Sequence, residues 1–355
     1  MLRLEIRLVV FLAALALLFL LAVEWSVDGR RYGPALSDGD SPRRRSATYR
    51  SAGIVSTKTP NKKRQKNYSF DPLPSNVVES VDGFLFFVGY ARSGHSIVAS
   101  FLDAHPNVVI AHEYALFNRW AETPDLFNNR REFLFNTLFN SSHFSAQAGL
   151  RQGKGGIKKK GYSLEVPSWY QGTYEGGITM IGDKAGGMTA QVYRRNKDKF
   201  VSVYRQLCST AGVPVYAIHV VRNPYDNIAT MLLYNDHVKQ TTNVTHKYRN
   251  IDALRKQIKA YFVQVESVLD MMKQAGLNDI TIHHSSFVKN PKGTMQRVCN
   301  SLSVTCSESY LQMVAEHTFS NESQSRHLVE WTPELVKTVE ANIAKHPILK
   351  HYKFK

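Results

Sequence analysis

The sequence lacks the patterns by which nucleic-acid-binding proteins are usually recognised. It has no zinc-finger spacing, no recognition helix with a basic face and no aromatic-studded sheet that would stack RNA bases. Its 45 Lys and Arg exceed its 29 Asp and Glu, but residues 1–66 alone hold 13 basic and 5 acidic side chains. About half of the net charge of +16 therefore lies in the N-terminal tail. The positive charge of the rest of the chain suits an enzyme with anionic substrates as well as a DNA-binding protein. Because the patterns of nucleic-acid binding are missing, we expect no nucleic-acid partner.

The N-terminus has a long apolar run but no tidy signal-peptide cleavage site. Sixteen uninterrupted apolar residues, 8–23, follow a basic start, and Glu24 places a charge where cleavage needs small side chains. With Trp25 at the interface, the run is long enough for a spanning helix. An uncleaved signal anchor is therefore favoured over a cleaved signal peptide, with a cytoplasmic tail at 1–7 and a membrane helix at 8–25.

No hydrophobic periodicity is found in residues 26–80, which are rich in Arg, Lys, Ser and Pro. That composition is typical of a solvated, mostly disordered stem. We expect the folded, lumenal domain to occupy residues 81–355. No internal repeat divides it, and a hydrophobic content of 43% is enough to bury a core.

Two further features agree with a lumenal location. Four Asn-x-Ser/Thr sequons occur without an intervening proline, at Asn67, Asn140, Asn243 and Asn321. There are only three cysteines. Cys299 and Cys306 are spaced to close a small disulfide loop, and Cys208 then has no partner cysteine in the sequence. Two buried thiols are the alternative for the spaced pair.

Apolar runs typical of buried strands alternate with helical patterns along the domain. We expect strands at 84–88, 108–111, 178–182, 215–221 and 279–284, and helices at 96–105, 189–210, 251–275, 291–302, 307–317 and 332–345. Near-continuous apolar strands that alternate with helices indicate a parallel sheet covered on both faces. The sequence therefore predicts an α/β, P-loop-like three-layer fold with a central parallel sheet flanked by helices.

The segment 89-GYARSGHS-96 follows the first expected strand with the spacing G-x-x-x-x-G-x-S. A glycine-containing turn between a strand and a helix presents backbone N–H groups and a positive helix end to an anion. Ser96 adds a hydroxyl and Arg92 a guanidinium matched to phosphate oxygens. A nucleotide-hydrolysing P-loop needs lysine where His95 stands, so hydrolysis of nucleoside triphosphates is disfavoured. An ordinary tight turn is the alternative.

A second anion site is indicated by 219-HVVRNPYDNIATMLLY-234. Arg222 leaves the carboxyl end of a buried strand, where ligands bind in open α/β sheets. Pro224 pre-sets the first turn of the next helix, and Thr230 lies one to two turns into it. Arg222 and Thr230 together would clamp a phosphate; a strand-to-helix turn with a surface arginine is the alternative.

The pairing of these two elements resembles the sulfotransferases that use 3′-phosphoadenosine 5′-phosphosulfate (PAPS). That family combines an R-S-G-x-[S/T] loop after the first strand with a later strand ending R-N-P-x-D and a hydroxyl eight residues beyond the arginine. The resemblance implies PAPS as co-substrate and no metal. It assigns the 5′-phosphosulfate site to Arg92, Ser93, Gly94, His95 and Ser96, and the 3′-phosphate site to Arg222 and Thr230.

Further segments are similar to Golgi tyrosylprotein and carbohydrate sulfotransferases. The run 92-RSGHSIVASFLDAHPNVVIAHE-113 has the family's order of R-S-G, L-D-x-H-P and Glu, which implies Glu113 as general base and leaves His112 as second choice. The segment 182-GDKAGG-187 implies that Lys184 lies, with Arg92, beside the transferred group. The segment 325-SRHLVEW-331 implies that Ser325 and Arg326 close over the nucleotide.

Two departures bear on the acceptor and the loop. His95 stands where threonine or serine is usual, and His112-Glu113 replaces the Glu-Glu pair of the tyrosylprotein enzymes. The resemblance implies a single-pass type II Golgi membrane sulfotransferase whose acceptor is a carbohydrate of a glycan or proteoglycan. Tyrosine in an acidic peptide is the alternative acceptor, and a nucleotide-binding protein without this activity is the alternative function. The Lys-rich segment 154–160 would grip an anionic acceptor, unless it is only a solvated loop.

Overall fold

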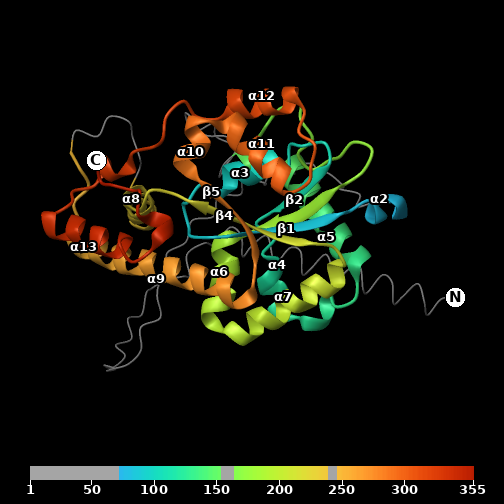
Figure 1. The fold of residues 1–355 in the computed structure, drawn as a ribbon, viewed down its shortest axis with the longest axis horizontal. Coiled ribbons are helices and arrows are strands. Elements are labelled where there is room, and N and C mark those ends of the chain that lie inside the picture. Colours follow the sequence, from blue (N-terminus) through green and yellow to red (C-terminus); the bar gives the residue numbers. More distant parts are fainter. Residues whose placement is uncertain (1–71, 153–163, 239–245) are drawn as a thin grey trace, which may run out of the picture. The chain divides into compact units, whose positions relative to one another are not determined.

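The computed structural model describes residues 72–152, 164–238 and 246–355. These residues form a five-stranded sheet with the order β2-β3-β1-β4-β5, and every pairing is parallel (Figure 1). The strands are β1 (Gly83–Val88), β2 (Val108–His112), β3 (Met180–Lys184), β4 (Val215–Val221) and β5 (Asn278–His283). The predicted α/β fold with a central parallel sheet is confirmed.

Helices cover both faces of the sheet (Figure 1). One face carries α3 (His95–Leu102), α10 (His284–Lys289), α11 (Pro291–Ser301) and α12 (Glu308–His317). The other face carries α4 (Leu116–Glu122), α5 (Arg131–Gln147), α6 (Gly186–Arg195), α7 (Lys197–Ala211), α8 (Pro224–Asn235) and α9 (Ile251–Ala275), with α13 (Pro333–Ile343) packed on α8 and α9. Short 3-10 helices are η1 (Pro124–Leu126), η2 (Leu150–Gln152), η3 (Ser325–Leu328) and η4 (Pro347–Leu349).

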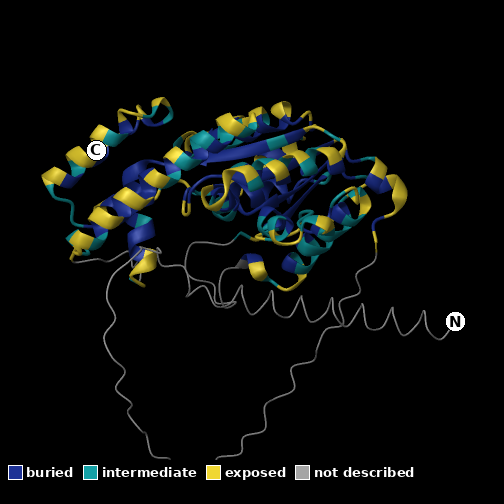
Figure 2. Ribbon diagram, turned by 90° about the horizontal axis from the view of Figure 1, so that it is seen from below, coloured by how far each residue is buried: buried dark blue, intermediate teal, exposed yellow. Residues whose placement is uncertain are grey.

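Burial on both faces explains why β1, β2 and β4 are largely apolar without alternation. In β1, Phe84 and Phe86 pack against the α4–α9 face, whereas Leu85 and Phe87 pack against the α3–α12 face. All four side chains are buried, and β1 and its neighbour β3 are buried along their length (Figure 2). A strand enclosed in this way has no solvent side on which a polar residue would be favoured.

Several element ends differ from the sequence prediction. β4 and α9 match their expected ranges, but β3 begins and ends two residues later than expected, so Lys184 is its last residue. The helix expected at 189–210 is two helices, α6 and α7. Asn196 between them is extended, with φ −158°, and its side chain accepts the Lys199 N–H as the N-cap of α7.

The folded part begins before Val81, the expected start. α2 (Ser75–Glu79) precedes β1, and Leu73, Val77 and Val78 are buried in the core. The end of the expected stem, 72–80, is therefore part of the fold. The expected anchor (8–25), the rest of the stem and the Lys-rich segment 154–160 lie outside the described residues.

Cys299 at the end of α11 and Cys306 in the following turn form a disulfide, which confirms the predicted pairing. Cys208 in α7 is a half-buried free thiol.

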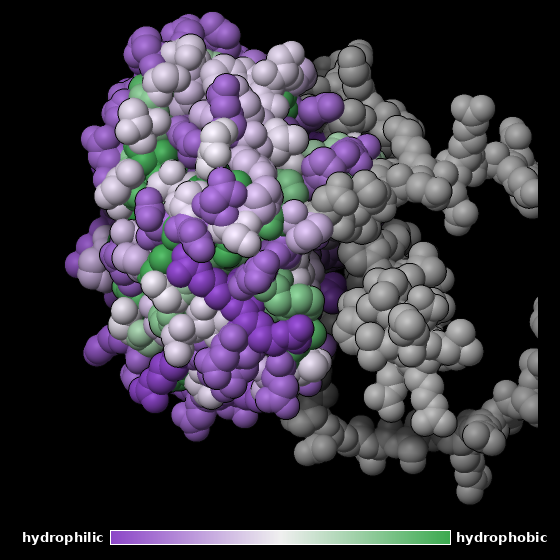
Figure 3. All heavy atoms as spheres, turned by 90° about the vertical axis from the view of Figure 1, so that its right-hand side faces the viewer, coloured by the Kyte–Doolittle hydropathy of each residue, from purple (hydrophilic) through white to green (hydrophobic). Residues whose placement is uncertain are grey.

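The side of the molecule on which α2 lies is mainly hydrophilic, with scattered apolar side chains (Figure 3). Large apolar side chains that are exposed in the described residues are Leu150, Tyr234 and Val263. Single exposed apolar residues are normal on a protein surface and by themselves mark no site. Across 72–152, 164–238 and 246–355, no helix combines the length and apolar character needed to cross a bilayer.

Candidate active site

The two predicted anion-binding elements are in direct contact at the carboxyl ends of β1 and β4. These strands are neighbours in the sheet, so the segments that follow them leave the same edge. Arg222 Nη1 donates to the Arg92 carbonyl oxygen at 3.2 Å and to Thr230 Oγ1 at 3.1 Å. Asn227 Nδ2 donates to the Ala91 carbonyl oxygen at 2.7 Å. The second element therefore holds the backbone of the first.

The loop between β1 and α3 has the turn that its glycine spacing predicts. Gly94 is the N-cap of α3 with φ 97°, and a Cβ at this position would lie 2.5 Å from His284 Cδ2. Glycine is thus required both by the backbone conformation and by the neighbouring ring. The N–H groups of His95 and Ser96 lie in the first turn of α3, where no acceptor exists within the helix, and the helix dipole favours an anion there.

Ser93 and His95 brace this loop from within. Ser93 is fully buried, its N–H donates to the Tyr90 carbonyl at 3.4 Å, and its Oγ lies 3.2 Å from His95 Nδ1. Burial, together with the nearby Lys184 ammonium, lowers the pKa of His95 to about 4, so the imidazole is neutral at pH 7. The Ser93 hydroxyl therefore bonds within the loop, and the chain's unusual His95 is its partner.

The Arg92 side chain lies on α8. Its guanidinium carbon is 3.5 Å from the centre of the Tyr234 ring, a cation–π contact. Tyr234 lies one turn beyond Thr230 on the same helix, and Arg92 has a left-handed backbone with φ 66°. Sequence reasoning missed Tyr234, although its spacing of four from Thr230 was the available signal.

Lys184 and Glu113 form an ion pair at the ends of β3 and β2. Lys184 is buried, pairs with Glu113 Oε1, and donates to Ser96 Oγ at 3.0 Å. Burial raises the pKa of Glu113, but the charge and hydrogen bond of Lys184, together with the nearby His95 and His112, outweigh this effect and hold that pKa at about 2. The Glu113 side chain is nevertheless 43% exposed. The site thus presents an ionised carboxylate to solvent beside the start of α3.

His112 lies opposite Lys184 in the β2–β3 pairing. Burial, with the Lys184 charge, lowers the pKa of His112 to about 3. It is therefore neutral at pH 7, with little tendency to take up a proton.

A cluster of hydroxyls surrounds Arg222. Arg222 Nη2 donates to the Ser323 carbonyl at 3.1 Å and to Ser325 Oγ at 3.3 Å, and Thr230 Oγ1 donates to Ser325 Oγ at 2.9 Å. Ser323 Oγ lies 3.0 Å from Ser325 Oγ. Arg222, Thr230 and Ser325 are thus brought together, as expected, and Ser323 joins them without having been singled out from the sequence.

Arg326, by contrast, forms a buried ion pair with Asp226. Its backbone N–H donates to Asp226 Oδ1 at 3.0 Å and its guanidinium pairs with Asp226 Oδ2, both groups being buried. This pair anchors η3 to α8 and so carries Ser325 to Arg222. The guanidinium was expected to contact the nucleotide, whereas in this structure it fixes the segment that carries Ser325.

His284 is a further residue of this edge that the sequence did not indicate. It follows β5, and its ring is the group that a side chain at position 94 would strike. Its Nδ1 is buried and has no hydrogen-bond partner within the described residues. Burial, together with Arg222, lowers its pKa to about 4. His284 is therefore a neutral ring between the first loop and the Arg222 cluster.

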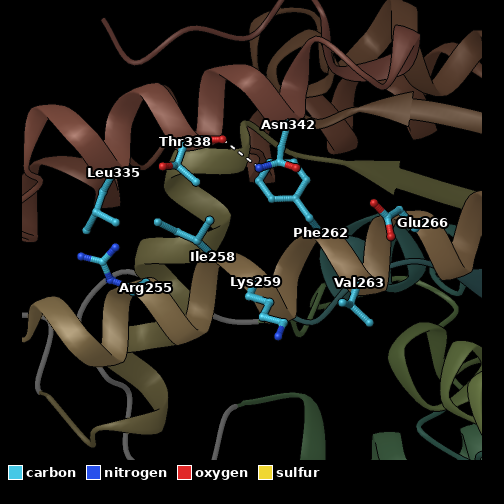
Figure 4. A pocket seen from close by; sticks show the side chains of 9 residues that line it. All are labelled: Arg255, Ile258, Lys259, Phe262, Val263, Glu266, Leu335, Thr338 and Asn342. Carbon is cyan, nitrogen blue, oxygen red and sulfur yellow. Dashed lines mark hydrogen bonds between the residues drawn. The ribbon is translucent and has the colours of Figure 1, made fainter.

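Two other features of the described residues lie apart from these side chains. A groove of about 330 Å³ runs between α9 and α13 (Figure 4), and none of the predicted site residues lines it. No group of three or more His, Cys, Asp or Glu within 72–152, 164–238 and 246–355 has the geometry of a metal site.

No protein-family model and no curated protein matches the chain. Solved structures that match include sulfotransferase STF9 from Mycobacterium avium, with 11% identity over 77% of this chain and 78% of that one, and a TM-score of 0.45. A sulfotransferase from Alicyclobacillus acidocaldarius has 16% identity over 76% and 96%, with a TM-score of 0.36. Mouse sulfotransferase SULT7A1 complexed with PAP has 14% identity over 76% and 87%, with a TM-score of 0.39. Matches this distant decide no activity, which must come from the chain's own residues.

Proposed function

We propose that the folded domain is a sulfotransferase that transfers a sulfuryl group from PAPS to an acceptor hydroxyl. The observation that carries this proposal is the contact between two anion-binding elements 130 residues apart, in which Arg222 bonds both the Arg92 carbonyl and Thr230. A donor with a 5′-phosphosulfate and a 3′-phosphate requires two adjoining anion sites of this kind. A nucleoside triphosphate requires one site for consecutive phosphates and a lysine where His95 stands.

The residues of this edge fit such a donor. The first turn of α3, with Gly94 removing any side chain, forms a cradle of N–H groups for the 5′ end. Arg222, Thr230 and Ser325 offer a buried guanidinium and hydroxyls for the 3′-phosphate. When bound, the donor supplies a labile bond from sulfur to a phosphate oxygen.

Glu113 and Lys184 would carry out the transfer. Glu113 accepts the proton of the acceptor hydroxyl while the acceptor oxygen bonds to sulfur and the bond from sulfur to the donor's phosphate oxygen breaks. Lys184 and the N–H groups of α3 offset the charge on the sulfuryl oxygens and on the departing 3′,5′-bisphosphate. Arg92, held on α8, is the second cation that the resemblance assigns to this step.

The ion pair between Lys184 and Glu113 also links the basicity of Glu113 to the binding of PAPS. With Lys184 beside it, Glu113 has a pKa of about 2 and is a weak base. If Lys184 turns toward the sulfuryl oxygens, the main interaction that lowers this pKa is lost, and burial then raises it. Glu113 would therefore gain basicity only when a donor occupies the site.

Within this proposal, the acceptor is a carbohydrate hydroxyl of a glycan or proteoglycan. The observation that favours it over a tyrosine hydroxyl is the neutral His112 in place of the first carboxylate of the tyrosylprotein pattern. We also propose a single-pass type II location in the Golgi membrane, supported by the apolar run 8–23 and by a disulfide suited to an oxidising compartment.

The experiment incubates the full-length chain in detergent with PAPS labelled on sulfur and with panels of glycans and of tyrosine peptides. Transfer to a glycan that is abolished by Glu113→Ala is the expected result. Tight binding of 3′,5′-bisphosphate nucleotide without transfer to any acceptor, unchanged by Glu113→Ala, would instead support a non-catalytic nucleotide-binding protein. No binding of that nucleotide would refute both.

A further inference from the structure

Asp183 is a buried carboxylate that precedes Lys184 at the end of β3. Only 3% of its surface is exposed, and each of its oxygens accepts a backbone N–H. Oδ1 accepts from Tyr114 at 3.1 Å and Oδ2 from Leu116 at 2.8 Å. α4 begins at Leu116, and its N-cap residue Ala115 has no side-chain acceptor. Asp183 therefore accepts, from another strand, the N–H of Leu116, which has no acceptor within α4, and the N–H of Tyr114 just before the helix.

The segment that Asp183 holds includes Glu113. Glu113 and Ala115 have left-handed backbones, with φ 58° and 62°. Residues with a Cβ adopt this conformation only when surrounding contacts impose it. The Glu113 N–H donates to the Lys184 carbonyl at 3.0 Å, so three hydrogen bonds from the end of β3 fix this turn.

The orientation of the Glu113 carboxylate depends on this turn. Its side chain is partly exposed and pairs with Lys184, the residue next to Asp183. If the Tyr114 and Leu116 N–H groups lost their acceptor, the left-handed residues would be free to relax toward ordinary conformations. The carboxylate would then move relative to Lys184 and the start of α3.

We propose that Asp183 is a positioning residue that aims the Glu113 carboxylate at the transfer site by holding the N–H groups of Tyr114 and Leu116. It acts through the backbone and has no part in proton transfer. Its effect on catalysis rests on the proposed function, whereas its effect on the turn does not.

The test compares Asp183→Ala and Asp183→Asn with the wild-type full-length chain. Asp183→Ala is expected to lower kcat about 100-fold, as a small misplacement of a catalytic group does, with the KM for PAPS unchanged. Asn keeps one acceptor oxygen and should lose less. Exchange of the Tyr114 and Leu116 amide hydrogens should become at least about tenfold faster in Asp183→Ala, because local opening controls it.

Asp103→Asn is the matched control. Asp103 is also a buried carboxylate that accepts backbone N–H groups, from Ile110 at 2.6 Å and from Gly172 at 3.1 Å, and it pairs with the buried Arg151 instead of holding the turn at Glu113. This variant should lower the unfolding temperature and leave the kcat of the folded protein unchanged.

Two results would overturn the inference: unchanged kcat in a folded Asp183→Ala protein, or amide exchange at 114 and 116 as slow as in the wild type. If Asp183→Ala does not fold, Asp183→Asn gives the same two readouts. If the wild type transfers no sulfuryl group, the proposed function fails, and the amide-exchange result still decides whether Asp183 holds the turn.

Discussion

The Arg222 cluster and the Glu113–Lys184 pair lie at the same edge of the sheet but are built differently. Arg222 is buried and donates hydrogen bonds to two carbonyls and two hydroxyls, and its charge also acts on the carboxyl groups of Asp226 and Glu322. Lys184 is also buried, but its partner is a carboxylate that is 43% exposed. A phosphate can join the carbonyls and hydroxyls around Arg222, whereas a sulfuryl group at Lys184 must compete with the Glu113 carboxylate that already pairs with it. The first arrangement suits binding and the second suits chemistry.

The largest effect is expected from Glu113→Gln, which removes the proposed base. Removing the base should lower kcat roughly 10²- to 10⁴-fold, because the acceptor proton then has no carboxylate to receive it. Affinity for 3′,5′-bisphosphate nucleotide, measured by calorimetry, should not fall. His112→Gln is the matched control and should cost far less, because His112 is already neutral. Equal losses in the two variants would contradict the assignment of Glu113.

Arg222→Met should instead damage binding. Loss of charged hydrogen bonds to the 3′-phosphate is expected to weaken nucleotide affinity about 10- to 100-fold. Adenosine 5′-phosphosulfate, which lacks that phosphate, should lose much less affinity. Equal weakening for both nucleotides would mean that Arg222 acts only by holding the Arg92 carbonyl.

A smaller effect is expected from His95→Thr. A threonine adds a hydroxyl to the loop, and one added hydrogen bond to the proposed donor should tighten PAPS binding about threefold to tenfold. The competing effect is loss of the His95 contact with Ser93. Weaker binding in this variant would show that the bracing of the loop outweighs the added hydroxyl.

The smallest effect concerns stability and pH. The pKa of Glu113 in the folded protein is about 2, below its ordinary value of 4.5, so its ionised form stabilises the fold. This contribution is fully present above pH 4.5 and is lost as the pH falls toward 2. The difference in unfolding temperature between the wild type and Glu113→Gln should therefore shrink as the pH is lowered from 5 to 3. A difference that stays constant would mean that the ion pair does not stabilise the fold.

The sequence predicted those parts of the site that depend on residues close together along the chain. The turn after β1 follows from glycine spacing, and the meeting of Arg222 with Thr230 follows from a strand end and a helix that begins at Pro224. Contacts between distant segments left no such signal. The Asp226 partner of Arg326 lies 100 residues away, and Asp183 reaches Tyr114 across 69. These contacts depend on which strands are neighbours in the sheet. The apolar pattern of parallel strands does not predict that order.

A structure of the chain with 3′,5′-bisphosphate nucleotide bound would decide whether the loop after β1 and the Arg222 cluster together form one donor site. We expect the 3′-phosphate to contact Arg222, Thr230 and Ser325, and the 5′-phosphate to lie at the first turn of α3 near Lys184. A 5′-phosphate at Arg222, or a nucleotide bound away from both elements, would contradict this expectation.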